Sequence, residues 1–153
     1  MLTRLREIVE KVAAAASLTD ALDLLVNETC LAMDTEVCSI YLADNDRRCY
    51  YLMATRGLKK PRGRTIALAF DEGVVGLVGR RAEPINLADA QSHPSFKYVP
   101  QVKEDRFRSF LGVPIIHRRQ LLGVLVVQQR ELRQFDESEE SFMVTLATQM
   151  AGI

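Results

Sequence analysis

Two adjoining apolar segments in the last third of the chain constrain its fold more than any other feature. Residues 109–116 (SFLGVPII) and 121–128 (LLGVLVVQ) are separated by a short polar stretch at 117–120 (HRRQ). Apolar runs of this length around a polar turn predict a β-hairpin. Both strands are too apolar on either face to lie in water, so we expect both faces of the hairpin to be covered.

A C-terminal helix is predicted over residues 136–153. Asp136 and Glu139 form a D-x-x-E pattern, in which an N-cap acceptor is followed three residues later by a Glu that can reach back. The apolar side chains after them recur at helical spacing, at Phe142, Met143, Leu146, Met150 and Ile153. This pattern still runs at the last residue, so we expect the helix to lead into further domains of a longer protein.

The rest of the chain alternates helical and extended patterns. Residues 1–16 predict an N-terminal helix with a narrow apolar seam, and a second helix is expected from about residue 19 to residue 33. A short helix is predicted at 73–81. Strands are predicted at 38–43, 49–55, 65–70 and 85–87. Helices at both ends with hairpins between them indicate one α+β domain over residues 1–153, built on an antiparallel sheet.

A long segment at residues 88–108 separates the fourth strand from the C-terminal hairpin. Loops of this length are uncommon in compact domains and are usually functional or disordered. This one carries prolines and the aromatic residues Phe96 and Tyr98, and a brief helix is expected within it. We therefore predict a folded cover over a pocket on one face of the sheet.

Composition excludes several classes of function. Lys+Arg and Asp+Glu are both 20, which argues against non-specific nucleic-acid binding. No apolar run approaches the roughly 20 residues that a membrane span needs, and the charged N-terminus does not read as a signal peptide. Cys30, Cys38 and Cys49 have no C-x-x-C spacing. An odd number of cysteines with this spacing is more typical of reduced thiols in a cytoplasmic protein than of disulfides or of a metal site.

Five short segments occur in an order that resembles the GAF sensory family: 38–44 (CSIYLAD), 72–76 (EGVVG), 84–87 (PINL), 110–115 (FLGVPI) and 122–125 (LGVL). The match covers nearly the whole chain. A narrower likeness, to the GAF domains at the N-terminus of the enzymes I of nitrogen phosphotransferase systems, is carried by residues 48–58 (RCYYLMATRGL) and 135–142 (FDESEESF).

The resemblance implies a six-stranded antiparallel sheet, with the N- and C-terminal helices on one face and a short-helix cover over a pocket on the other. It also implies a parent that takes phosphate from phosphoenolpyruvate onto a histidine and passes it to a nitrogen phosphocarrier protein. That histidine lies in later domains, so no catalytic residue, cofactor or metal is expected in this chain. The implied effectors are glutamine and 2-oxoglutarate.

The pocket walls are expected by fold analogy, because the strand pattern does not say which face carries the pocket. They are Tyr41, Phe70, Gly73, Val74, Phe96, Tyr98, Ser109, Leu111 and Val113. Backbone N–H groups at the start of the Gly73 helix, with Arg106 and Arg108, would meet the carboxylate of an effector. Alternatively, these arginines are solvated and pair with Glu104 or Asp105.

Other motifs have structural interpretations that we prefer. The glycines of residues 73–79 allow close helix packing, and a structural or solvated role is preferred for both histidines, His93 and His117. A subfamily of GAF enzymes reduces methionine sulfoxide with cysteines near the cover, where this chain has none. Cyclic-nucleotide-binding GAF domains carry an Asn-Lys pair, a Phe and an Asp-Glu pair, and the corresponding places here read Gln128-Gln129, Phe135 and Glu139-Glu140. The missing Asn-Lys pair argues against cyclic-nucleotide binding, so we expect Phe135 to close the core and the glutamates to favour the helix N-terminus. A basic run forms either a solvated loop or a docking surface: Arg56, Lys59, Lys60, Arg62 and Arg64.

Three hypotheses for function follow. The leading one is a regulatory domain that binds a small effector and biases downstream phosphotransferase domains. The second is a ligand-free dimerisation module, and the third is a redox enzyme. A homodimer is expected through apolar seams on the first and last helices, formed by Leu5, Val9, Val12, Met143, Leu146 and Met150.

Overall fold

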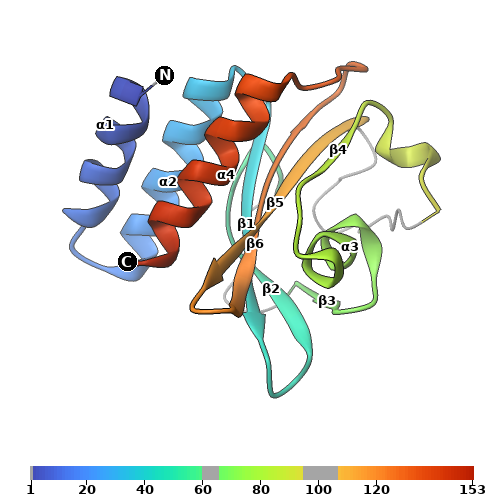
Figure 1. Ribbon diagram of the computed structural model, residues 1–153, viewed down its shortest axis with the longest axis horizontal. Helices are drawn as coiled ribbons and strands as arrows, with labels where there is room; N and C mark the ends of the chain where they lie inside the picture. The colour runs from blue at the N-terminus through green and yellow to red at the C-terminus, as the bar shows by residue number, and fades with distance from the viewer. Residues whose placement is uncertain (1, 60–65, 95–106) are drawn as a thin grey trace.

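Six strands form one antiparallel sheet in the computed structural model, which describes residues 2–59, 66–94 and 107–153. The strand order is β3-β2-β1-β6-β5-β4, so the C-terminal hairpin lies inside the sheet (Figure 1). The α+β prediction and the hairpin are confirmed. The strands are β1 (Val37–Asp44), β2 (Cys49–Arg56), β3 (Ala67–Ala69), β4 (Ile85–Leu87), β5 (Ser109–His117) and β6 (Gln120–Gln129).

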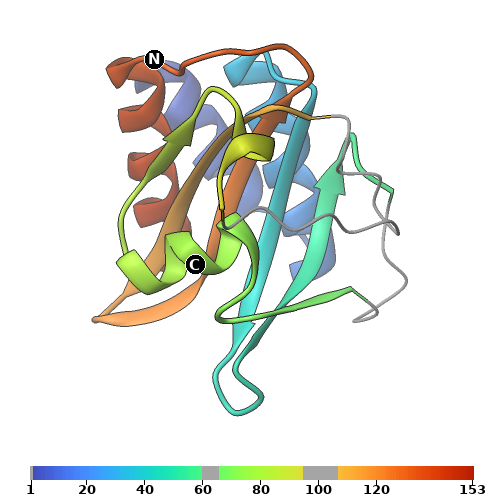
Figure 2. The same ribbon diagram turned by 90° about the vertical axis from the view of Figure 1, so that its right-hand side faces the viewer.

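Three helices cover one face of the sheet. The helices α2 (Leu18–Met33) and α4 (Glu137–Ala151) pack directly on the strands, and α1 (Leu2–Ala13) lies outside them, against α2 and α4 (Figure 1). The opposite face carries α3 (Gly73–Arg81) and the 3₁₀ turn η1 (Ala90–Ser92), as Figure 2 shows. The predicted N- and C-terminal helices therefore do share one side of the sheet.

The covered sheet has a separate apolar core on each face. On β5, Leu111 and Val113 pack with the helical layer, whereas Phe110 packs with α3. On β6, Leu125 lies in the helical core and Val124 in the other. Because successive side chains of a strand point to opposite faces, a strand between two cores must be apolar at every position. This explains the continuous apolar pattern of the hairpin.

Capping residues fix where the helices begin. Asp136 and Glu139 form a reciprocal box: the N–H of Glu139 donates to Oδ1 of Asp136 over 2.8 Å, and the N–H of Asp136 donates to Oε1 of Glu139 over 2.9 Å. The predicted start of the C-terminal helix is confirmed. The first helix is shorter than predicted and ends at Ala13, because Ser17 caps α2 by accepting the N–H of Asp20 over 3.1 Å.

The apolar seams of α1 and α4 are used inside the domain. Leu5 and Val12 of α1 are buried in the helical core together with Met143 and Leu146 of α4. The remaining seam residues, Val9 and Met150, pack partly buried against the same core. The seam residues therefore serve first to hold the helices on the sheet and leave little apolar surface for a second copy.

Candidate functional site

The structure divides the predicted pocket residues between the two faces of the sheet. Tyr41 and Val74 are buried on the α3 side, and Phe70 packs partly buried beside them. Leu111 and Val113 were assigned to the wrong face, because they belong to the core beneath α2 and α4. Strand alternation places Phe110 on the α3 side instead.

The remaining predicted residues have backbone or sheet-end roles, or lie outside the described residues. The Oγ of the buried Ser109 donates to the carbonyl of Gln129 over 3.2 Å. Arg108 has an exposed side chain, and its main chain pairs with Gln129 and Ala90. Five residues lie outside the described ranges, so their predicted roles stay predictions: Phe96, Tyr98, Glu104, Asp105 and Arg106.

The glycines of α3 serve close packing, as preferred from the sequence. A Cβ at Gly76 would lie 2.6 Å from the carbonyl oxygen of Phe70, and one at Gly79 would lie 1.8 Å from the hydroxyl of Tyr50. Gly73 has a φ of 68°, which favours glycine at the helix start. The carboxylate of Glu72 lies beside this start and accepts the N–H of Ala69 over 2.9 Å. This negative group lies near the helix start, where the sequence predicts an effector carboxylate, although it makes no capping hydrogen bond to α3.

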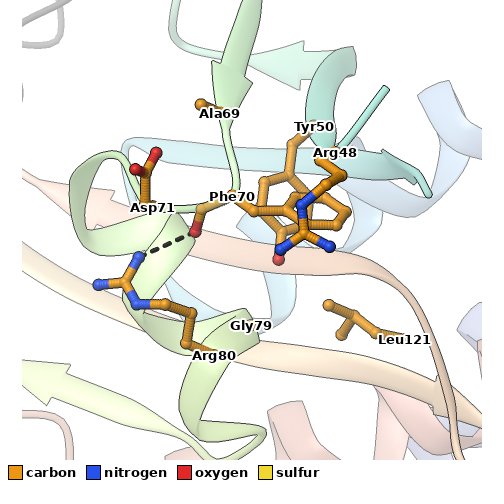
Figure 3. A pocket seen from close by; sticks show the side chains of 8 residues that line it. All are labelled: Arg48, Tyr50, Ala69, Phe70, Asp71, Gly79, Arg80 and Leu121. Atoms are coloured by element: carbon orange, nitrogen blue, oxygen red, sulfur yellow. Dashed lines mark hydrogen bonds between the residues drawn. The ribbon is translucent and has the colours of Figure 1, made fainter. Parts of the chain in front are cut away.

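A cavity of about 330 Å³ opens on the α3 side at one end of the sheet. It lies where four segments meet: the end of the β1–β2 turn, the β3–α3 connection, the last turn of α3 and the start of β6 (Figure 3). Among the described residues of the predicted pocket, Phe70 alone lines it. The described lining residues are Arg48, Tyr50, Ala69, Phe70, Asp71, Gly79, Arg80 and Leu121.

Two arginines and an aromatic pair give this cavity its chemistry. The rings of Tyr50 and Phe70 pack with centroids 4.8 Å apart, and the guanidinium of Arg48 lies 5.4 Å from the centroid of Phe70. From α3, Arg80 donates to the carbonyl oxygen of Phe70 over 2.8 Å. Burial raises the pKa of Tyr50, against a smaller opposing effect of Arg80, so its hydroxyl is neutral near pH 7. The arrangement suits binding of an anion.

Little in the sequence indicates this cavity, because its lining residues come from four separate parts of the chain. Arg48 and Tyr50 belong to a segment that carried the family likeness, but neither was predicted to line a site. The only signal was the residue type: arginines in turns beside aromatic residues. Such pairs are common on surfaces and gain meaning only when the fold brings them to one cavity.

A second hollow, of about 320 Å³, lies on the helical side. Its described lining residues are all apolar, and they come from α1, α2, the end of the sheet and the end of α4. Leu18 and Ile153, at its edge, are exposed. With no polar or charged side chain in that lining, this hollow has nothing to orient a charged metabolite.

No cysteine is among the described residues that line the cavity. Cys30 and Cys38 are buried in the helical core, where desolvation raises the pKa of both thiols. Cys49 is half-buried on β2. Thiols that stay protonated are poor nucleophiles, so this arrangement does not favour the redox hypothesis. In the ranges that the structure describes, no three His, Cys, Asp or Glu side chains gather as metal ligands would.

The positions that correspond to the cyclic-nucleotide motif have structural roles. Phe135 is buried in the helical core, and Glu139 caps α4. Glu140 accepts from the amide of Asn86 over 3.3 Å, and the same amide donates to the carbonyl of Phe135 over 2.8 Å. Both structural interpretations from the sequence are confirmed. His117 is exposed at the end of β5, as predicted, and His93 is half-buried after η1.

No helix among the described residues has the length and apolar character that crossing a bilayer requires.

Comparison with known proteins agrees with the geometry. The model of the GAF domain family matches residues 17–153. A phosphoenolpyruvate-dependent phosphotransferase system protein from Salmonella typhimurium and one from Escherichia coli are each 84% identical over all 153 residues. The chain spans 20% of the length of these relatives. The solved GAF domain of a phosphoenolpyruvate-protein phosphotransferase from Coxiella burnetii is 46% identical, with a TM-score of 0.93 over 99% of this chain and 90% of that one.

Proposed function

The chain belongs to the GAF domain family, and from this premise we propose that it is the regulatory sensing domain of a phosphoenolpyruvate-dependent phosphotransferase. The observation that carries the proposal is the 84% identity to a fifth of two phosphotransferase system proteins. The parent takes phosphate from phosphoenolpyruvate onto a histidine outside this chain and passes it to a nitrogen phosphocarrier protein. This chain contributes no catalytic residue.

The effector in this proposal is glutamine or 2-oxoglutarate, so that the parent responds to nitrogen supply in the cytoplasm. Both molecules are small carboxylates, and the cationic cavity on the α3 side is a suitable environment for one. Binding there favours one arrangement of α3 and the sheet. The helices on the other face transmit this preference to the downstream domains. The ligand can shift the equilibrium between the two arrangements by no more than the difference in its binding free energy for them.

A thermal-shift titration separates this proposal from a ligand-free dimerisation module. A specific ligand raises the melting temperature because it binds the folded state, whereas a packed domain without a ligand site does not respond. We expect glutamine or 2-oxoglutarate to raise the melting temperature in a concentration-dependent way. No response to either molecule up to millimolar concentration would contradict the sensing role, and a dimer in sedimentation would then favour the dimerisation module.

Incubation of this 153-residue chain with labelled phosphoenolpyruvate tests the absence of catalysis. We expect no label, because the chain has no match to a phosphoenolpyruvate-binding domain and its two histidines lie at the end of β5, for His117, and after η1, for His93. Acid-labile phosphate on either histidine would contradict the assignment of phosphotransfer to later domains.

A further inference from the structure

We propose that the cavity lined by Arg48, Tyr50 and Arg80 is the effector site of this domain, and that it takes a small carboxylate. The inference rests on the proposed sensing function and deepens it, because it assigns recognition of the carboxylate to the side chains of Arg48, Tyr50 and Arg80. It places the ligand at the last turn of α3 and not at the N-terminus of that helix, near which the carboxylate of Glu72 accepts the N–H of Ala69. It also makes no use of Arg108, whose exposed side chain is not among the residues that line the cavity.

The hydroxyl of Tyr50 is the first observation that points to a ligand. The residue is only 1% exposed, yet it lines the cavity and its hydroxyl has no hydrogen-bond partner among the described residues. This hydroxyl lies against Gly79 of α3, where any side chain would displace it. A buried phenol normally finds a hydrogen-bond partner, so a hydroxyl at a cavity wall invites an acceptor from a bound molecule.

The two arginines are the second observation. Within the described part of the chain, neither Arg48 nor Arg80 has a carboxylate within ion-pairing distance. Arg80 is held by its hydrogen bond to the carbonyl of Phe70, and Arg48 by its stack on the Phe70 ring (Figure 3). Guanidinium groups that are already positioned lose less freedom when they bind a planar carboxylate.

The volume of the cavity and its other lining residues limit the size and the chemical groups of the ligand. A volume of about 330 Å³ is at the low end for small-molecule sites, which run from roughly 300 to 1,000 Å³. Phe70 and Leu121 provide an apolar surface for a short aliphatic stem. The carboxylate of Asp71, on the same rim, offers a partner for an ammonium group. The ammonium group of an amino acid would pair with Asp71, whereas an oxoacid has no ammonium group to do so.

Isothermal calorimetry of the chain with L-glutamine, 2-oxoglutarate and glutaramide tests the site and the class. Glutaramide has the same carbon skeleton but is neutral. The variants are Tyr50→Phe, which removes only the hydroxyl, and Arg48→Gln, which removes one charge. Arg81→Gln is the matched control, because Arg81 is an exposed arginine next to Arg80 that does not line the cavity.

We expect at least one of the two carboxylates to bind and glutaramide not to bind. Tyr50→Phe and Arg48→Gln should each weaken binding about tenfold or more, as expected when a hydrogen bond to a charged group is lost, and Arg81→Gln should bind as the parent does. Asp71→Asn should weaken glutamine binding if glutamine is the ligand, and strengthen 2-oxoglutarate binding if the oxoacid is.

Three results would overturn the inference. If a carboxylate binds Tyr50→Phe and Arg48→Gln as tightly as it binds the parent, the effector site lies elsewhere and the sensing function stands. If glutaramide binds as tightly as the acids, the class is wrong. If none of the three molecules binds the parent, the sensing function for these effectors fails together with the site.

Discussion

At the scale of single residues, Arg133 joins three elements of the fold. One of its terminal nitrogens donates to the carbonyl of Asp34 and to Oε1 of Gln129, each over 3.0 Å, and the other donates to the carbonyl of Met33 over 3.3 Å and pairs with Glu139. Its guanidinium also lies 4.6 Å from the centroid of the Phe135 ring. A single planar fork thus ties the end of α2, the end of β6 and the start of α4 together.

Replacing Arg133 with Ala should lower the free energy of unfolding by about 2–3 kcal/mol, because it leaves several polar groups without their charged donor. Urea denaturation measures the change. Arg130→Ala is the control, since the nearby Arg130 pairs with Glu36 at 3.4 Å between side chains that are 58% and 40% exposed. Such a surface pair contributes about 0–1 kcal/mol. Equal effects of the two substitutions would contradict the role of Arg133.

Burial of Cys30 and Cys38 makes the stability of the domain depend on pH. Their pKa values are raised in the folded state, chiefly by desolvation, so the folded chain holds these protons more tightly than the unfolded chain does. The stabilisation that these two thiols contribute is therefore fully present below the thiol pKa of the unfolded chain, roughly 8.5. It is lost as the pH rises through the higher pKa values of the folded chain. Unfolding experiments between pH 7 and pH 10 should show falling stability.

The double variant Cys30→Ala/Cys38→Ala isolates the thiol contribution. It should be less stable than the parent at pH 7, because the smaller side chains leave space in the core. Its stability should nevertheless fall less steeply above pH 8.5. A slope equal to that of the parent would show that other groups, such as Tyr50 with its own raised pKa, dominate the alkaline loss.

At the scale of elements, the turn between β5 and β6 contains avoidable strain. Arg118 and Arg119 have φ values of 51° and 66°, in the left-handed region that disfavours residues with a side chain. Two-residue hairpin turns with both φ values positive prefer Asn-Gly. The double substitution Arg118→Asn/Arg119→Gly should therefore stabilise the domain by about 1 kcal/mol, measured by urea denaturation.

The matched control for this turn is Arg118→Gln/Arg119→Gln, which removes both charges but keeps both side chains. We expect it to leave stability nearly unchanged. If Gln-Gln stabilises the domain as much as Asn-Gly does, then repulsion between the arginines, and not backbone conformation, is the cause.

The elements also show what the sequence could predict. Periodicity located the helices and strands, and the D-x-x-E pattern gave the start of α4, because these signals are local. The face of the sheet on which each side chain of β5 lies was not predictable. Phe110 and Leu111 are both apolar, and each packs in the apolar core on its own face of the sheet. The cavity was not predictable either. Arg48 and Leu121 are far apart in sequence and meet only through the sheet and the packing of α3.

At the scale of the whole molecule, the sheet separates two layers with different properties. One face carries three helices over an apolar core, and the other carries α3 and the cationic cavity (Figures 1 and 2). Glu28 of α2 strengthens the helical layer by pairing with Arg4 at 3.0 Å and Lys11 at 2.8 Å of α1. Among the described elements, the strands therefore connect a ligand on the cavity side to the helices.

The most direct test of the proposed function is the rate of phosphoenolpyruvate-dependent autophosphorylation of the full-length protein, with glutamine or 2-oxoglutarate titrated. We predict that the rate changes over the concentration range in which calorimetry shows this domain to become saturated. The same protein without residues 1–153 should be insensitive to the effector. A full-length rate that stays constant while the domain fills with ligand would contradict the regulatory role.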